Sequence, residues 1–469
     1  MSHRPLIRLL LFLALAIVPA LAGPVDPFPV RMVKLQGDPA AAATRAHLAY
    51  SRSLGFNAVW VYGHQAGVWT DGDIRLNPEF LDLADWCRNQ DMTIFVSVNP
   101  VAATGGDFIF HEKSGEKRIA RFLRKLRRKA GVHDFVLSFD DMPTRLTDLN
   151  DFLTYGASTA PAHLDLTRRL YRRMNKSDTF WLAATAYCDA HLGDGNGPYT
   201  KPFLERLSTL DPDIGLIWTG PEVLSRSITG DDIRNARRRL GGRKILLYDN
   251  YPVNDDGRRL SLGLVLGPLR NRSPEIAGHV AAYLACPMNQ VGASRLPLRT
   301  VAEYLADPAG YDPDLSWQGA IADLAGDDPA ALDALKTQAM EWGGWIGGRN
   351  YHHADESSIF TAARELAHPA YVARWGYTLK RYPDRIAALS KLSDTWFRDD
   401  LLLAMKRRLA VARVFPLIVE YRARKAAGRK DADDILRTIL TVRERTAERP
   451  VRLLLESFLE EAGVPSEAE

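Results

Sequence analysis

Short apolar segments recur along the first two-thirds of the chain, at intervals that suit one repeated structural unit. Within each segment the apolar residues are continuous rather than alternating with polar ones, which is typical of strands that are buried on both faces. Seven segments are clear and an eighth is weaker; they cover residues 29–35, 57–62, 93–98, 134–139, 180–185, 214–218, 244–249 and 281–288.

Helical patterns separate most of these segments. Residues 117–130, for example, place Ile119, Phe122, Leu123 and Leu126 on one stripe of a helix. Each strand start follows the previous one by roughly the length of a strand–helix unit. Eight such units predict an α/β fold, a (β/α)8 barrel of the TIM type.

The pattern changes after the eighth segment. Helical periodicity continues with little strand signal, and amphipathic helices are predicted at residues 401–421 and 433–446, with a kink at Pro416. We therefore expect a barrel over residues 27–305 and an all-α helical domain over residues 306–469.

The first 22 residues are typical of a secretory signal peptide. Arg4 and Arg8 give a basic start, residues 9–18 form an apolar run too short to span a bilayer comfortably, and residues 20–22 (Ala-Leu-Ala) match a cleavage site. We expect residues 1–22 to be removed and the protein to be exported, either periplasmic or secreted; a retained anchor is the alternative. Later apolar stretches are shorter than a membrane span, so we expect no stable membrane insertion after cleavage.

Composition and charge narrow the class of partner. Hydrophobic residues make up 46% and charged residues 25% of the 469 residues, which are ordinary values for a soluble folded chain. The 61 basic and 57 acidic residues leave a net charge of +4, so the overall charge does not indicate a nucleic-acid partner. Three cysteines, Cys87, Cys188 and Cys286, exclude a disulfide framework but leave one bridge possible.

Groups that carry chemistry in such a barrel gather where strands end and the following loops begin. Asp140 and Asp141 follow the fourth segment, and neighbouring carboxylates raise the pKa of one of them, which keeps a proton available for donation. Both reach the mouth only if the chain has already turned there, as Met142-Pro143 permits; a helix cap or a solvated pair is the alternative. Polar and aromatic residues after later segments complete a possible sugar pocket: Tyr187, Trp218, Tyr248, Asn250 and Asp255.

Three strings follow the aspartate pair at fitting distances, namely IWTGPEV at 217–223, YDNYPVND at 248–255 and LGP at 266–268. With FDD at 139–141 they resemble glycoside hydrolase family 84, the retaining β-N-acetylglucosaminidases, which include protein O-GlcNAc hydrolases and bacterial enzymes called hyaluronoglucosaminidases. The resemblance covers the barrel. It implies an enzyme that removes β-linked N-acetylglucosamine from glycans or glycoconjugates.

The resemblance also implies substrate-assisted catalysis, in which the sugar's own 2-acetamido oxygen attacks the anomeric carbon and forms an oxazoline. Asp140 would orient the acetamido N–H, Asp141 would act as general acid and then as base, and Tyr187 would hold the acetamido oxygen. No metal or organic cofactor is implied. The remaining residues would position the hydroxyl groups (Asn250 and Asp255) or wall the pocket (Trp218 and Tyr248).

The chain departs from the family pattern where members grip the sugar. A Gly-Phe-Tyr-Gly-like segment is replaced by residues 32–39 (MVKLQGDP), a lysine after the second strand by His64 and Gln65, and an Asn-Pro pair by Cys286-Pro287. His64 is a candidate sugar-binding donor in place of that lysine, with a surface-loop histidine as the alternative. The departures leave two other functions open: a non-catalytic carbohydrate-binding protein on the same barrel, and a glycosidase of different sugar specificity.

Overall fold

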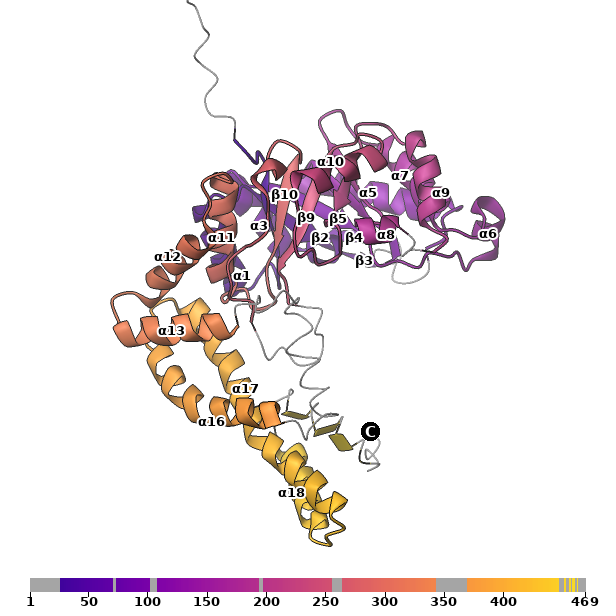
Figure 1. Ribbon diagram of the computed structural model, residues 1–469. Coiled ribbons are helices and arrows are strands. Elements are labelled where there is room, and N and C mark those ends of the chain that lie inside the picture. Colours follow the sequence, from indigo (N-terminus) through magenta and orange to yellow (C-terminus); the bar gives the residue numbers. More distant parts are fainter. Residues whose placement is uncertain are drawn as a thin grey trace, which may run out of the picture.

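The computed structural model shows a barrel with an elongated helical region beside it (Figure 1). It describes residues 26–70, 73–101, 108–193, 197–254, 264–342 and 369–446, and parts of 451–462. The predicted signal peptide, residues 1–22, lies outside the described residues.

Eight parallel strands close into a barrel in the order β1-β10-β9-β8-β7-β6-β5-β2. Each predicted apolar segment overlaps one of these strands, so the predicted (β/α)8 fold is confirmed. A separate antiparallel pair, β3 (Gly67–Thr70) and β4 (Asp73–Leu76), lies outside the barrel. The barrel strands are β1 (Arg31–Lys34), β2 (Ala58–Tyr62), β5 (Thr93–Val98), β6 (Asp134–Ser138), β7 (Thr179–Ala183), β8 (Gly215–Trp218), β9 (Ile245–Pro252) and β10 (Ala282–Cys286).

Successive residues of a strand point alternately into the barrel and out toward the helices, and this alternation divides the core into two clusters. In β1, Met32 belongs to the inner cluster and Val33 to the outer one. Large aromatic side chains of the inner cluster, Trp60, Phe95 and Trp181, fill the barrel. Because the interior is packed, a ligand site must lie above it, at the barrel mouth.

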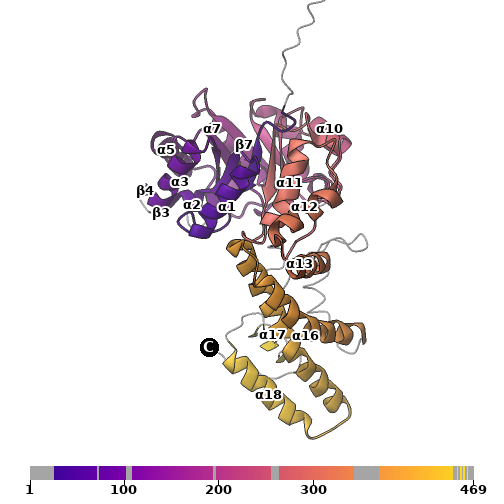
Figure 2. The same ribbon diagram turned by 90° about the vertical axis from the view of Figure 1, so that its left-hand side faces the viewer.

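Helices cover the outside of the barrel (Figure 2). The buried stripe of α5 (Lys113–Ala130) contains Ile119, Phe122, Leu123 and Leu126, as the sequence predicts. The other helices of this part are α1 (Ala42–Ser53), α2 (Gly63–Ala66), α3 (Pro78–Asn89), α6 (Leu149–Tyr155), α7 (Ala160–Tyr171), α8 (Asp189–Leu192), α9 (Thr200–Arg206), α10 (Gly230–Arg239) and α11 (Arg295–Ala306), with short 3-10 turns at Leu207–Thr209 and Pro274–Ile276.

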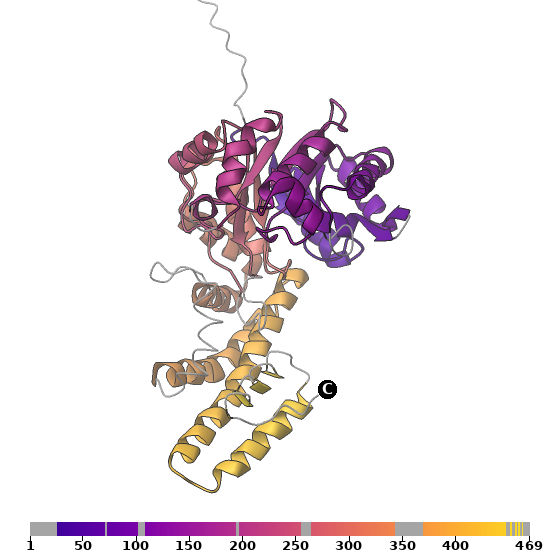
Figure 3. The ribbon, with the colours of Figure 1, turned by 90° about the vertical axis from the view of Figure 1, so that its right-hand side faces the viewer.

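The predicted C-terminal helical region is confirmed, and Figure 3 shows it extending away from the barrel. The helices at 401–421 and 433–446 correspond to α17 and α18, and α17 continues through Pro416. Among the described helices, none is both long enough and apolar enough to cross a bilayer. The helices of this region are α12 (Pro313–Ala325), α13 (Pro329–Glu341), α16 (Pro369–Leu389), α17 (Thr395–Ala426) and α18 (Ala432–Arg445).

Candidate active site

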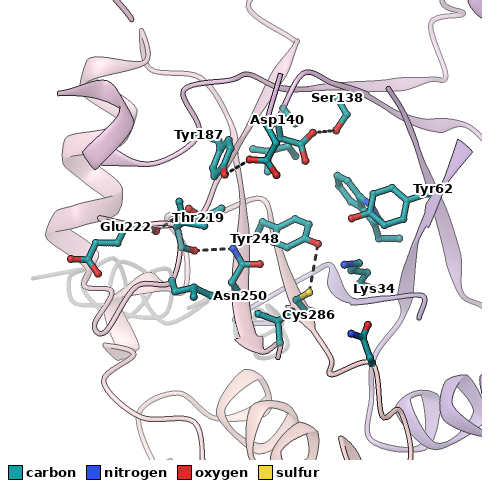
Figure 4. A pocket seen from close by; sticks show the side chains of 18 residues that line it. Lys34, Tyr62, Ser138, Asp140, Tyr187, Thr219, Glu222, Tyr248, Asn250 and Cys286 are labelled. Carbon is teal, nitrogen blue, oxygen red and sulfur yellow. Dashed lines mark hydrogen bonds between the residues drawn. The ribbon is translucent and has the colours of Figure 1, made fainter. Parts of the chain in front are cut away.

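A pocket of about 950 Å³ opens where the carboxyl ends of the barrel strands meet (Figure 4). Its volume lies within the range of small-ligand sites. Carboxylates, a lysine, amides and aromatic rings from several strands line it together. The mouth of the barrel therefore carries the mixture of polar and aromatic groups that the sequence predicts for a sugar pocket.

Asp140 and Asp141 both line this pocket, in the turn that follows β6. Strand alternation would separate two consecutive side chains, but Asp141 has a φ of 56°, and this left-handed turn lets both carboxylates face the pocket. The Ser138 hydroxyl donates to Asp140 Oδ1 at 2.5 Å, and the Tyr187 hydroxyl donates to Asp141 Oδ1 at 2.8 Å (Figure 4). Each carboxylate is thus held by its own hydroxyl donor.

The surroundings of Asp140 act on its pKa in opposite directions. Burial raises the pKa of Asp140, and the charge of Asp141 raises it further. The hydrogen bond from Ser138 and the positive charge of Lys34 lower it. Burial, followed by the hydrogen bond to Asp141, also raises the pKa of the Tyr187 hydroxyl, so that hydroxyl keeps its proton and acts as a donor at neutral pH.

Trp218 points away from the pocket, contrary to the prediction that it walls the site. Its neighbours Ile217 and Thr219 line the pocket, whereas Trp218 is fully buried in the cluster between strands and helices. The prediction is wrong because Trp218 occupies an outward-facing position of β8.

Tyr248 and Asn250 occupy inward-facing positions of β9 and line the pocket. The Tyr248 hydroxyl donates to Cys286 Sγ at 3.7 Å, across to β10. Asn250 Nδ2 donates to the Val223 carbonyl at 2.8 Å, which ties β9 to the loop after β8 (Figure 4). Both residues therefore lie where the sequence predicts them, while Asp255, the third predicted residue of this string, lies outside the described residues.

Asp249, between the two pocket residues of β9, faces the opposite side of the strand. It forms a two-point ion pair with Arg272, with N···O distances of 2.7 and 2.8 Å, and accepts a hydrogen bond from the Tyr283 hydroxyl. The Asp249 and Arg272 side chains are only 2% and 5% exposed. This buried group anchors β9 from outside the barrel.

The side of the pocket formed by β1 and β2 holds aromatic rings and a cation. Trp60 packs edge-on against Tyr248 with ring centroids 5.5 Å apart, and Tyr62 lies beside Trp60. The Lys34 ammonium lies 5.3 Å from the centre of the Tyr62 ring. His64 stacks on Tyr62 but is exposed and outside the pocket lining, because α2 carries it beyond the end of β2. His64 is thus at the surface, as the alternative has it, and its role as a sugar-binding donor stays a prediction.

The three cysteines are free and buried, so the bridge that their number permits is not formed. Cys286 lines the pocket, whereas Cys87 and Cys188 do not.

One group among the described residues has the donors and spacing for a metal ion: His111, Asp148 and Asp151. Its carboxylates already accept hydrogen bonds from backbone N–H groups. Asp151 accepts the N–H groups of Phe110 and His111 at 2.8 and 2.7 Å, and Asp148 accepts that of Asp151 at 2.8 Å. The group therefore ties the segment before α5 to α6, away from the pocket.

A family model described as beta-N-acetylglucosaminidase matches residues 75–339, more than half of the chain. The chain belongs to this family. The resemblance to the β-N-acetylglucosaminidases of glycoside hydrolase family 84 that the motifs indicate is thus confirmed. The family match includes Asp140, Asp141, Tyr187 and Asn250, and it extends beyond the barrel to α13.

Individual relatives support the same family. The chain is 26% identical over 231 residues to the protein O-GlcNAcases of Rattus norvegicus and Mus musculus, which covers 48% of this chain and 23% of each relative. The chain thus matches about a quarter of the length of these relatives.

Solved structures show the same fold. A mutant of the Thermobaculum terrenum O-GlcNAc hydrolase matches with a TM-score of 0.62 and 20% identity, covering 94% of this chain and 97% of that one. A protein named CpGH84B matches with a TM-score of 0.60 and 17% identity, covering 93% and 77%. At these identities the likeness concerns the fold.

Several pocket residues of this β-N-acetylglucosaminidase family member escape sequence reasoning. Strand alternation relates them once one inward residue is known from the structure: Met32 is an inner-core residue, so the lysine two positions later also points inward. The same alternation relates Trp60 to Tyr62 on β2. The missed polar and aromatic residues are Lys34, Trp60, Tyr62, Ser138, Glu222 and Asn289.

Proposed function

We propose that this chain is an exported, retaining β-N-acetylglucosaminidase that removes β-linked N-acetylglucosamine from glycans or glycoconjugates by substrate-assisted catalysis. The observation that carries the proposal is the group formed by Asp140, Asp141 and Tyr187 in the pocket, with a hydroxyl donor on each carboxylate. Membership of the β-N-acetylglucosaminidase family supports the reaction class.

In the first step the acetamido oxygen of the sugar attacks C1, and the bond between C1 and the leaving oxygen breaks. Asp141, in its protonated form, gives its proton to that oxygen. Asp140, as a carboxylate, accepts a hydrogen bond from the acetamido N–H and so increases the electron density on the attacking oxygen. The intermediate is a protonated oxazoline (an oxazolinium ion) in which the acetamido oxygen is bonded to C1 and the nitrogen keeps its proton, hydrogen-bonded to the Asp140 carboxylate.

In the second step a water molecule attacks C1 from the face that the leaving group has vacated. The Asp141 carboxylate accepts the proton of this water, and the bond between C1 and the acetamido oxygen breaks. Two inversions at C1 give net retention, and Asp141 returns to its protonated form.

Tyr187 links the hydrogen bond seen in the structure without substrate to these two reaction steps. Its hydroxyl carries one proton, which it donates to Asp141 in the structure. In the proposed complex the same proton turns to the acetamido oxygen and holds it in line with C1. Asp141 is then released to face the leaving oxygen.

Asp140 has to be ionised in order to accept the acetamido N–H. Burial and the neighbouring Asp141 oppose ionisation, whereas Ser138 and Lys34 favour it. The lysine on β1 is thus proposed to keep Asp140 in its working form.

Export rests on the first 22 residues, with their basic start, apolar run and small-residue site. Expression in a bacterial host, followed by cell fractionation and N-terminal sequencing, tests it. The expected mature chain begins at Gly23 and lies outside the cytoplasm. A cytoplasmic chain that still begins at residue 1 would contradict export.

Release of the aryl group from an aryl N-acetyl-β-glucosaminide tests the enzymatic proposal. We expect turnover by the wild type and a fall of about 100-fold or more in Asp141→Asn, the range for loss of general acid–base catalysis. Asp85→Asn, which alters an exposed aspartate of α3 outside the pocket, serves as the matched control and should retain activity. A folded wild type that hydrolyses neither this substrate nor related hexosaminides would refute the proposal.

Two control measurements separate the alternative functions. Release from an aryl β-glucoside, which lacks the acetamido group, would indicate a glycosidase of different specificity, because substrate assistance needs that group. Saturable binding of N-acetylglucosamine oligomers without turnover would indicate a carbohydrate-binding protein.

A further inference from the structure

The helical region reaches the barrel beside the pocket. One end of α17 lies against the barrel in Figure 2, and its contact there is with residues 287–294, the segment between β10 and α11. This segment also contains Asn289, which lines the pocket.

Asp400 of α17 is the centre of this contact. Its Oδ2 accepts the backbone N–H groups of Gly292 at 2.8 Å and Ala293 at 3.2 Å. A carboxylate makes stronger hydrogen bonds with such donors than a neutral acceptor does. At Gly292 an added Cβ would lie 2.1 Å from the carbonyl oxygen of Trp396, so the two backbones approach too closely for any side chain.

A second contact fixes the same end of α17. Asp394 accepts the N–H of Phe397 at 3.1 Å, which caps the helix, and also forms an ion pair with Arg295, the first residue of α11. The Arg295 guanidinium lies 4.9 Å from the centre of the Tyr50 ring, and the Tyr50 hydroxyl donates to the Arg295 carbonyl at 3.1 Å. The first two turns of α17 are therefore joined to the barrel through two separate carboxylates, Asp394 and Asp400.

The other part of the segment is bonded to the pocket side. The N–H of Asn289 donates to Asn254 Oδ1 at 3.1 Å, and Asn254 Nδ2 donates to Gln290 Oε1 at 2.7 Å. Gln36 Nε2 donates to the Pro287 carbonyl at 2.9 Å. Only two residues separate Asn289 from Gly292, so a displacement of the α17 contact is transmitted to the pocket.

We propose that Asp400 is a positioning residue for the pocket: it holds residues 287–294 against α17 and thereby sets the place of Asn289. The helical region then contributes to sugar binding without supplying a group to the reaction. The effect on sugar binding rests on the proposed function, whereas the hold on the segment does not.

Two measurements on the full-length chain test this role. In Asp400→Ala we expect faster amide hydrogen exchange in a peptide covering residues 288–294 and unchanged exchange in β6. With an aryl N-acetyl-β-glucosaminide, KM should rise about 3- to 10-fold, which is the effect expected when one hydrogen bond between the pocket and the sugar is lost, while kcat stays within about twofold. Asp400→Asn keeps an oxygen acceptor and should restore most of the wild-type KM.

Two further variants make the outcome specific. Gly292→Ala separates the same contact from the barrel side and should reproduce the exchange and KM changes of Asp400→Ala. Asp399→Ala alters the exposed neighbour, which pairs with Arg398, and should match the wild type.

Unchanged exchange in residues 288–294, or faster exchange across the whole barrel, would overturn the positioning role. So would a fall in kcat with an unchanged KM, because that result places the effect on the reaction rather than on binding. If the wild type neither hydrolyses nor binds the sugar, the proposed function fails, and the exchange measurement alone still decides whether Asp400 holds the segment.

Discussion

Replacing Tyr187 by phenylalanine isolates one hydrogen bond of the candidate site. The change removes only the hydroxyl that donates to Asp141 at 2.8 Å. The ring should keep its place, because it packs edge-on against His191 with centroids 4.7 Å apart. In the proposed mechanism the same hydroxyl holds the acetamido oxygen during its attack on C1. The variant therefore loses an interaction that counts in the transition state.

The expected size of the effect follows from the kind of bond that is lost. The acetamido oxygen is a neutral acceptor, so the lost hydrogen bond contributes about 0.5–1.5 kcal/mol; misplacement of the attacking oxygen adds to this, and we expect kcat to fall roughly 10- to 100-fold. Steady-state kinetics with an aryl N-acetyl-β-glucosaminide measures kcat and KM separately. We expect most of the loss in kcat, because the hydroxyl aligns the acetamido oxygen with C1 and the variant loses that alignment during the attack.

A matched control distinguishes chemistry from general damage. The Tyr155 hydroxyl also donates to a carboxylate, that of Asp165 at 3.0 Å, but lies outside the pocket lining. Tyr155→Phe should retain kcat. The reasoning fails if Tyr187→Phe keeps kcat within about twofold of the wild type, or if Tyr155→Phe loses as much as Tyr187→Phe does.

Two other variants test the electrostatics of the barrel. Lys34→Met removes a positive charge that lowers the pKa of Asp140, so the pKa of Asp140 should rise further. Asp140 then loses its ionised form at a higher pH, and the acidic limb of kcat/KM should move up by about 1 pH unit. A limb that stays in place or moves down contradicts this. Arg272→Ala leaves Asp249 buried without its ion pair and should lower the free energy of unfolding by about 3–5 kcal/mol in denaturant titrations; an unchanged midpoint would show that the pair does not anchor β9.

The barrel strands were predictable because each is buried on both faces and therefore continuously apolar. The direction of individual side chains was harder to predict, because a run without alternation does not show which of its residues point into the barrel. The place of Trp218 at the end of a strand predicts a pocket residue, yet Trp218 lies one position away from the inward-facing Ile217 and Thr219. Lys34 and Arg31 are both charged residues of the first run and lie on opposite faces of β1, so charge alone does not show which of them points into the pocket.

The aspartate pair shows the opposite case. Alternation alone would have separated Asp140 from Asp141, and the turn that unites them appears in the sequence only as the following Met142-Pro143. The contact of Asp400 with Gly292 has no local signal at all, because the two residues lie 108 positions apart along the chain. Contacts of this kind depend on how the helical region packs, which sequence periodicity does not specify.

Alternate positions of β9 have different roles. Asp249 faces away from the barrel interior and bonds to Arg272 and Tyr283, while Tyr248 and Asn250 face inward and line the pocket. Directed evolution toward another sugar therefore has a clear template: randomise the two inner positions and leave the outer carboxylate untouched. Every member of such a library keeps the buried ion pair of Asp249 with Arg272, although the contacts of Tyr248 with Cys286 and of Asn250 with Val223 change with the inner residues.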